Sequence, residues 1–106
     1  MTVDTSKLIP AMRAAIEALQ RGDHAAWGAA FEPGATLLDD GELRDLAGFG
    51  RDAVGHERFS SIDHVAKDGL EISGHFQSEQ WGSFVTYFRI TLGPNGKISR
   101  LEVGQA

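Results

Sequence analysis

The chain has 106 residues, of which 42% are hydrophobic and 24% are charged, so composition and length predict one globular domain spanning residues 1–106. Acidic residues outnumber basic ones by 15 to 10, and the net charge of −5 argues against a nucleic-acid partner, which requires excess positive charge. Cysteine is absent, which excludes disulfides and thiolate chemistry, and no apolar run has the length of a signal or membrane-spanning segment, so we expect a cytoplasmic protein without a membrane partner.

The N-terminal part is predicted to form two helices. Apolar residues recur at helical spacing over residues 5–21, which predicts an amphipathic helix. Its buried stripe is expected to consist of Leu8, Ile9, Met12, Ala15, Ile16 and Leu19. Gly22 suits the left-handed position that ends a helix, and Asp23 suits the cap of the next one. That second helix is short and is expected to reach residue 31, where Pro33 and Gly34 stop it.

The middle of the chain is predicted to hold a hairpin and an irregular helix. Residues 35–39 form an expected strand, and Asp40 with Gly41 is a strong two-residue turn signal into a second strand over 42–46. A helix within 49–59 is expected to have Asp52 near its start, although several glycines lower the helix propensity here.

The C-terminal half is predicted to be an antiparallel meander. Apolar segments separated by turn residues cover 59–66, 70–78, 83–92 and 97–104. The loop at 67–69 resembles a three-residue hairpin connection that would pair Ala66 with Leu70, and this register turns His64 toward the apolar face.

The strand at 83–92 alternates in the way that a sheet covered on one face requires. The residues expected to face the helices are Phe84, Thr86, Phe88, Ile90 and Leu92, and those expected on the other face are Val85, Tyr87, Arg89 and Thr91. In the last strand Leu101 and Val103 are the expected inward residues. The outward strip of Val85, Tyr87 and Arg89 is partly apolar, so we expect a homodimer packed through the convex face of the sheet.

Three segments carry a resemblance to a known family: ALQRGD at 18–23, FEPGAT at 31–36 with Asp39 beyond it, and GKISRL at 96–101. Together with the order of the elements, they resemble the nuclear transport factor 2-like superfamily, especially its SnoaL-like branch. The resemblance implies an α+β fold in which a curved antiparallel sheet wraps around N-terminal helices, a cone-shaped, cystatin-like roll. It also implies dimers and a hydrophobic pocket, but not one reaction, because isomerases, cyclases, dehydratases, epoxide hydrolases and non-enzymatic proteins share this fold.

Asp39 is the first catalytic candidate. It matches the position of the carboxylate base in the ketosteroid isomerases of that superfamily, and a carboxylate at the mouth of an apolar pocket can accept a proton. The positions that match the two oxyanion donors of those enzymes are Ala15 and Phe88, which cannot donate. One such donor is worth about 3 kcal/mol of transition-state stabilisation, so we do not expect steroid isomerisation. The alternative for Asp39 is a solvated turn residue beside Asp40 and Gly41.

His64 is the second catalytic candidate, because imidazole exchanges protons near neutral pH and the expected register turns it inward. The alternative places it at the sheet rim, where solvent or backbone satisfies its nitrogens. The other histidines, His24, His56 and His75, have no spacing typical of a metal site, and the glycine-containing segments do not form a phosphate-binding loop. We therefore expect neither a metal nor a cofactor.

Aromatic residues are numerous for a chain of this length and can line a pocket for a flat apolar ligand. The expected ligand-binding residues are Trp27, Phe31, Phe59, Phe76, Phe84, Phe88, Leu101 and Val103. The alternative is that these side chains fill the core.

The sequence therefore predicts a SnoaL-like pocket protein that binds a small apolar molecule. One hypothesis is a weak acid/base enzyme of the cyclase or isomerase type, with Asp39 as base and His64 assisting. The other is a non-catalytic domain that binds a hydrophobic ligand or only dimerises, and the missing oxyanion donors favour it.

Overall fold

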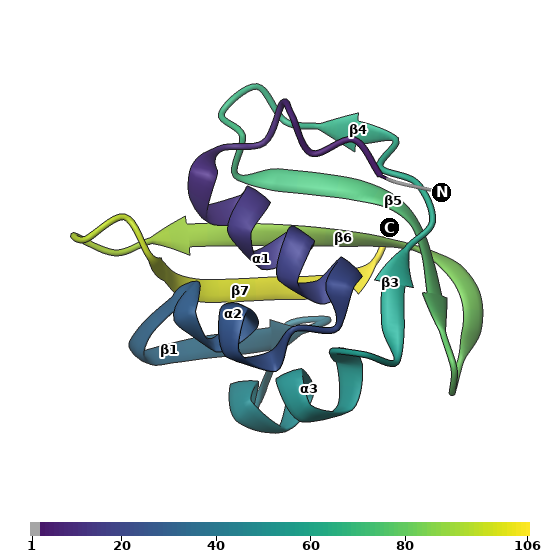
Figure 1. Cartoon of the computed structure of the whole chain (residues 1–106), viewed down its shortest axis with the longest axis horizontal. Coiled ribbons are helices and arrows are strands. Elements are labelled where there is room, and N and C mark those ends of the chain that lie inside the picture. The colour runs from purple at the N-terminus through teal and green to yellow at the C-terminus, as the bar shows by residue number, and fades with distance from the viewer. Residues whose placement is uncertain (1–2) are drawn as a thin grey trace.

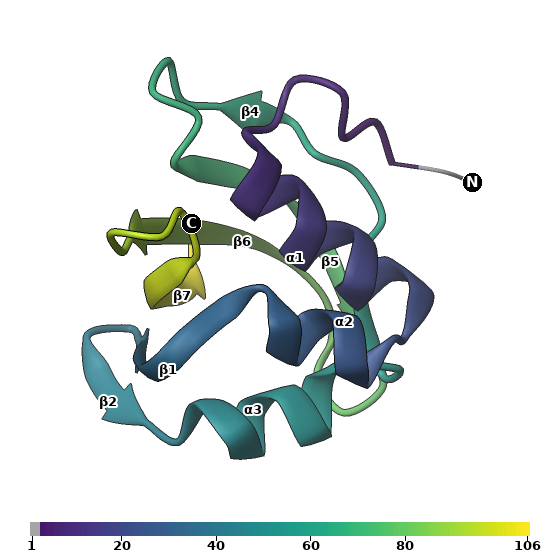
Figure 2. The same cartoon turned by 60° about the vertical axis from the view of Figure 1, so that its left-hand side comes forward.

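A computed structural model describes residues 3–106. Its elements are α1 (Pro10–Arg21), α2 (His24–Ala29), β1 (Phe31–Asp39), β2 (Glu42–Arg44), α3 (Leu46–Ala53), β3 (Glu57–Phe59), β4 (His64–Val65), β5 (Glu71–Ser78), β6 (Gly82–Leu92) and β7 (Ile98–Gln105). Figures 1 and 2 show α1 and α2 against the same face of a curved sheet, with α3 beside β1. This arrangement confirms the predicted α+β, cystatin-like roll.

The sheet runs in the order β2-β1-β7-β6-β5-β3, with β4 also paired to β5. Strands β5, β6 and β7 form the predicted antiparallel meander. The pair β1–β7 is parallel, with Leu37 beside Leu101 and Asp39 beside Val103. Because the two strands run in the same direction, their C-terminal ends lie side by side. Asp39 is the last residue of β1 and lies at this end of the sheet.

The first helix has most of the predicted buried stripe but starts later than predicted, so Leu8 and Ile9 precede it and Ile9 is only half-buried. Met12, Ala15, Ile16 and Leu19 are buried, as expected from their spacing. The helix begins at Pro10, because proline at the first helical position gives up an amide that has no intrahelical partner there. Gly22 ends the helix with a φ of 69°, and the Asp23 side chain accepts a hydrogen bond from the Ala26 amide as the cap of α2.

The other two helices differ from their predicted limits. Helix α2 ends at Ala29, and Phe31 already begins β1, so Pro33 and Gly34 do not stop a helix. They lie in β1 where its pairing with β7 is irregular, a place where proline removes no regular ladder hydrogen bond. Helix α3 is capped by Asp45, which accepts from the Ala47 and Gly48 amides, so the predicted start near Asp52 was wrong.

The predicted strand over residues 59–66 is divided into β3 and β4, which both pair with β5. Phe59 lies opposite Phe76, whereas His64 lies opposite Ser73, so the segment between them carries extra residues that bulge from the ladder. Gly74 of β5 makes room for this bulge. A Cβ atom at Gly74 would overlap the carbonyl oxygen of Ser61 and lie 2.9 Å from the Ile62 Cα.

The hairpin between β4 and β5 differs from its predicted register by one residue. The Ala66 amide donates to the carbonyl of Glu71 rather than pairing with Leu70. Because side chains alternate across a sheet, a slip of one residue moves every side chain to the other face. Val65 therefore shares the inner face with Ile72, and His64 points outward and is exposed. The prediction that His64 turns inward was wrong.

The core lies between α1 and the inner face of the sheet. The rings of Phe76 and Phe88 pack against Phe59, with centroids 5.0 and 5.1 Å from its own. Leu101 and Val103 are buried, as predicted. The alternation predicted for β6 is also observed, except that Leu92 is exposed at the end of the strand.

Across residues 3–106 the helices are too short or too polar to cross a membrane.

Candidate functional site

A cleft of about 970 Å³ opens at one end of the roll. Its lining comes from the β1–β2 hairpin, from α3 and the loop after it, from the β5–β6 hairpin and from the end of β7. The inward side chains of the sheet supply its apolar surface, and Phe49 and Ala53 of α3 face them. A hollow of this volume suits a small molecule, because ligand sites in proteins span a few hundred to about 1,000 Å³.

The predicted ligand-binding residues divide among three places. Those that line the cleft are Phe76, Phe84, Phe88 and Val103. Phe59 and Leu101, each 1% exposed, belong to the closed core. Trp27 and Phe31 line a separate depression of about 630 Å³ between α2, β1 and α3. Aromatic side chains thus fill the closed part of the roll, whereas others border the cleft at its open end.

Asp39 lies in the lining of the cleft, at the end of β1. Its side chain is 26% exposed, and its Oδ2 accepts a hydrogen bond of 2.5 Å from Nη1 of Arg44. The tight turn at Asp40 and Gly41, with φ values of 50° and 85°, has the predicted positive-φ geometry. Its register pairs Asp39 with Glu42, so Arg44, two residues further on, lies on the same face of the hairpin.

The neighbouring Asp40 has a different environment. Its Oδ1 accepts a hydrogen bond of 3.3 Å from the Gln105 amide and lies against Gly104 of β7. The phenol of Tyr87 is close to the same glycine on the convex face. Partial burial raises the pKa of Tyr87, and the negative charge of Asp40 adds to this effect. Asp40 thus ties the hairpin to the last strand and is the less suitable of the two aspartates for a reaction in the cleft.

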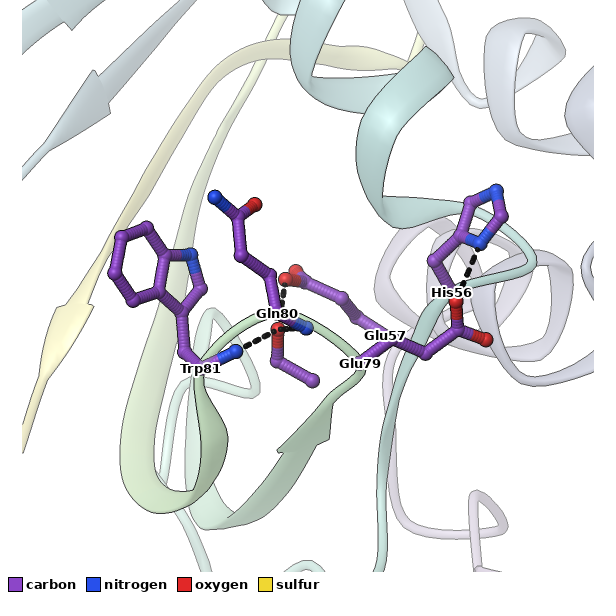
Figure 3. Close-up of polar contacts among 6 residues, drawn as sticks. His56, Glu57, Glu79, Gln80 and Trp81 are labelled. Atoms are coloured by element: carbon purple, nitrogen blue, oxygen red, sulfur yellow. Dashed lines mark hydrogen bonds and ion pairs between the residues drawn. The ribbon is translucent and has the colours of Figure 1, made fainter.

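The other wall of the cleft is the β5–β6 hairpin together with the start of β3. Ser78 connects them, because its hydroxyl donates to Oε2 of Glu57 at 2.7 Å and accepts from the amides of Gln80 and Trp81. His56 lies beside this wall, with its Nδ1 2.9 Å from Oε1 of Glu79 (Figure 3). The cleft therefore has polar groups on both sides of an apolar floor.

No family model matches the sequence, and no curated protein resembles it closely enough in sequence to serve as a relative. Solved structures do resemble it. A protein of Sinorhizobium meliloti assigned as a polyketide cyclase has a TM-score of 0.75 at 16% identity, over 94% of this chain and 98% of that one. An NTF2-like protein of unknown function from Cytophaga hutchinsonii has a TM-score of 0.72 at 13% identity, over 100% and 93%. The chain has the nuclear transport factor 2-like fold.

A third solved structure of similar shape is the epoxide hydrolase/cyclase-like enzyme SalBIII, which acts in pyran ring formation in the polyether salinomycin. It has a TM-score of 0.67 at 17% identity, over 91% of this chain and 88% of that one. The solved structures with this fold thus include a protein assigned as a polyketide cyclase, an epoxide hydrolase/cyclase-like enzyme and a protein of unknown function. The shared fold does not specify one reaction, because unrelated functions occur on the same fold.

The two positions that match the oxyanion donors of the isomerases carry no donor side chain. Ala15 and Phe88 are 3% and 2% exposed and offer no hydrogen-bond donor. The buried Thr86 also lines the cleft, but its hydroxyl already donates to the carbonyl of Gly104 at 2.6 Å. Arg44 is the cationic group in contact with Asp39, so it is the best placed donor for a developing negative charge.

His64 is not among the residues that line the cleft, and the histidine found there is His56. Sequence reasoning did not select His56, Glu57 or Ser78. The only local signal was the polar turn after Ser78, whereas the pairing of β3 with β5 that brings Glu57 to Ser78 joins residues far apart in the chain.

A second polar cluster lies away from the cleft, around the bulge between β3 and β4. His75 Nδ1 is 2.8 Å from Asp63 Oδ2 and 3.2 Å from Ser61 Oγ. A serine-activating relay needs the hydroxyl and the carboxylate on opposite ring nitrogens, but here both contact Nδ1. The hydrogen bond from the Ser61 hydroxyl, with that from His75, lowers the pKa of Asp63. We therefore assign this cluster a structural role, in which its hydrogen bonds stabilise the bulge.

Over residues 3–106, no group of His, Asp or Glu has the arrangement of a metal site.

Proposed function

We propose that this protein binds a small, largely apolar molecule in the cleft and transfers a proton to or from it through Asp39, as a simple cyclase or isomerase does. The observation that carries the proposal is the position of the Asp39 carboxylate in the lining of a cleft whose floor is aromatic. Such a floor can hold a flat substrate, and a carboxylate beside it can remove a proton next to a carbonyl group.

Arg44 has two roles in this proposal. Its contact with Oδ2 of Asp39 holds the carboxylate in one orientation and leaves Oδ1 to accept the proton. A guanidinium also carries more N–H groups than this one contact uses, so Arg44 can donate to an oxygen that becomes negative when the proton leaves. This role replaces, in part, the donors that are absent at Ala15 and Phe88.

Proton transfer can be tested before the natural substrate is known. The probes are 2-tetralone and 1-indanone, flat apolar ketones with exchangeable hydrogens next to the carbonyl. In deuterated buffer, the protein is expected to accelerate loss of the α-proton signal in the NMR spectrum, and Asp39→Asn is expected to abolish the acceleration. Asp68→Asn, in the loop between β4 and β5, serves as the matched control and is expected to retain it. Equal exchange rates for the wild type and Asp39→Asn would rule out this role for Asp39.

A second candidate function is ligand binding without catalysis. The specific observation in its favour is that Ala15 and Phe88 offer no donors and that Thr86 has already committed its hydroxyl proton. The same ketones distinguish the two functions. Chemical-shift changes at Phe84 and Val103 without accelerated exchange would favour binding alone.

We also propose that two copies pair through the convex face of the sheet. Val85 is 38% exposed on the outward side of β6, beside Tyr87 and Arg89. Arg89 Nη1 lies 3.5 Å from Oε1 of Glu71 on the neighbouring strand, so the strip combines apolar area with charges of both signs. A surface of this kind can pair with a second copy of itself around a two-fold axis.

A further inference from the structure

We propose that Glu57 is the anchor of the cleft for a protonated amine, and hence that the ligand is an apolar molecule that carries an amino group. This inference rests on the proposed binding of a small molecule in the cleft and adds the chemical class of that molecule. Three observations support it: the hydrogen bond to Glu57, the ion pairs of the other carboxylates in the cleft, and the aromatic residues nearby.

The Glu57 carboxylate is held in one orientation. Ser78 is 8% exposed, and its hydroxyl oxygen accepts hydrogen bonds of 3.1 and 3.0 Å from the amides of Gln80 and Trp81. With its lone pairs occupied in this way, the hydroxyl points its single proton at Oε2 of Glu57, 2.7 Å away. One carboxylate oxygen is therefore fixed by the protein, and Oε1 is left for a ligand.

The charges in the cleft leave Glu57 without a cation. Asp39 is paired with Arg44, and Glu79 contacts His56. Asp52 is paired with Arg51, and Asp40 accepts from a backbone amide. Among the ion pairs formed within the part of the chain that the structure describes, none includes Glu57. A half-buried carboxylate is stabilised by an opposite charge, and an ammonium group on the ligand would supply it.

The aromatic residues near this carboxylate suit the same ligand. Trp81, at the tip of the β5–β6 hairpin, is 70% exposed and lines the cleft. In the view of Figure 3, the Gln80 side chain and the Glu57 carboxylate lie between the Trp81 indole and His56. The face of an indole ring attracts a cation, and Phe76 and Phe84 can hold the apolar part of the molecule. An anionic ligand would instead meet the negative charge of Glu57.

The test compares two probes of nearly the same shape, 1-naphthylmethylamine and 1-naphthylmethanol. Their affinities for the full chain are measured at pH 7 by NMR titration, with the indole N–H signal of Trp81 as the reporter. We expect the amine, which is protonated at this pH, to bind about 10-fold more tightly than the alcohol. Glu57→Gln keeps an oxygen that can accept from Ser78 but removes the charge, and it is expected to lower this ratio to within about 2-fold.

The matched control is Glu79→Gln, which removes a carboxylate on the same wall of the cleft that already has His56 as its hydrogen-bond partner. It is expected to retain the preference for the amine. Binding of both probes in the cleft with equal affinity, or a preference that survives in Glu57→Gln, would overturn the anchor and leave the proposed binding function intact. Failure of both probes to shift any signal of the cleft would overturn the anchor together with the proposed function.

Discussion

The carboxylate of Asp39 and the guanidinium of Arg44 contact each other on the face of the β1–β2 hairpin that lines the cleft. The contact follows from the alternation of side chains along paired strands, since Asp39 lies opposite Glu42 and Arg44 is two residues further on. It brings a carboxylate and a guanidinium together in a cleft that is also lined by Phe76, Phe84 and Phe88.

Arg44→Gln is expected to reduce catalysis much more than stability. The Arg44 side chain is 54% exposed, and ion pairs this accessible to solvent contribute about 1 kcal/mol or less to folding. The variant is therefore expected to unfold at nearly the same urea concentration as the wild type, while exchange of the 2-tetralone α-proton slows by about 10-fold or more. Arg51→Gln, at a more exposed pair with Asp52, is the control for loss of a nearby charge. An exchange rate for Arg44→Gln equal to that of the wild type would exclude the proposed role of Arg44.

Gly74→Ala is expected to destabilise the fold by about 2 kcal/mol or more, because the new methyl group overlaps the backbone of Ser61 and that backbone has to move. Gly28→Ala is the matched control. A Cβ atom there meets nothing within 4 Å, and alanine favours a helix, so a gain of roughly 0.5–1 kcal/mol is expected. Urea unfolding followed by circular dichroism measures both changes. Equal stability of Gly74→Ala and the wild type would mean that the bulge does not lie over Gly74.

Asp63→Asn is expected to make stability less dependent on pH in the acid range. The Ser61 hydroxyl and then His75 lower the pKa of Asp63 in the folded protein below its ordinary value of 3.8. Stability from these contacts is therefore present above pH 3.8 and is lost as the pH falls through the lowered value. Thermal unfolding midpoints should differ between the wild type and the variant at pH 7, and the difference should be smaller at a pH below 3.8. A difference of the same size at both pH values would contradict this assignment.

If two copies pair as proposed, the protein is expected to sediment as a species of two chains at micromolar concentration. Val85→Glu places a charge in the centre of the convex strip and is expected to give the monomer, because an unpaired charge in an interface is unfavourable. Leu43→Ser removes an apolar side chain that is 73% exposed on β2, outside the strip, and should leave the dimer intact. A wild-type protein that sediments as a monomer at this concentration would rule out pairing through this face.

Periodic parts of the fold could be predicted from the sequence. The spacing of Met12, Ile16 and Leu19 and the alternation along β6 each report directly which side of an element is buried. The junction at Gly22 and Asp23 was predictable because each residue type has a specific backbone role there. The division of the segment over 59–66 was not, since it depends on the space that Gly74 leaves on a different strand.

Residues of the candidate site could be predicted only where a sequence motif near the residue itself indicates its role. Asp39 was selected through a family resemblance, whereas the turn signal that follows it favoured the alternative of a solvated turn residue. His64 was misplaced because one residue in the register of a hairpin decides which face a side chain takes. Glu57 and Ser78 depend on pairing between β3 and β5, which residues near either one in sequence do not specify.

Strand β7 lies between β1 and β6, yet it follows both of them in the sequence. Without it, the remaining strands form two separate groups, one containing β1 and β2 and the other β3 to β6. A nascent chain on the ribosome can therefore form its helices but cannot close the sheet until residues 98–105 have emerged. Because the pairing of β1 with β7 joins distant parts of the chain, we expect folding to be slow, with the apolar face of the incomplete sheet available to chaperones during that interval.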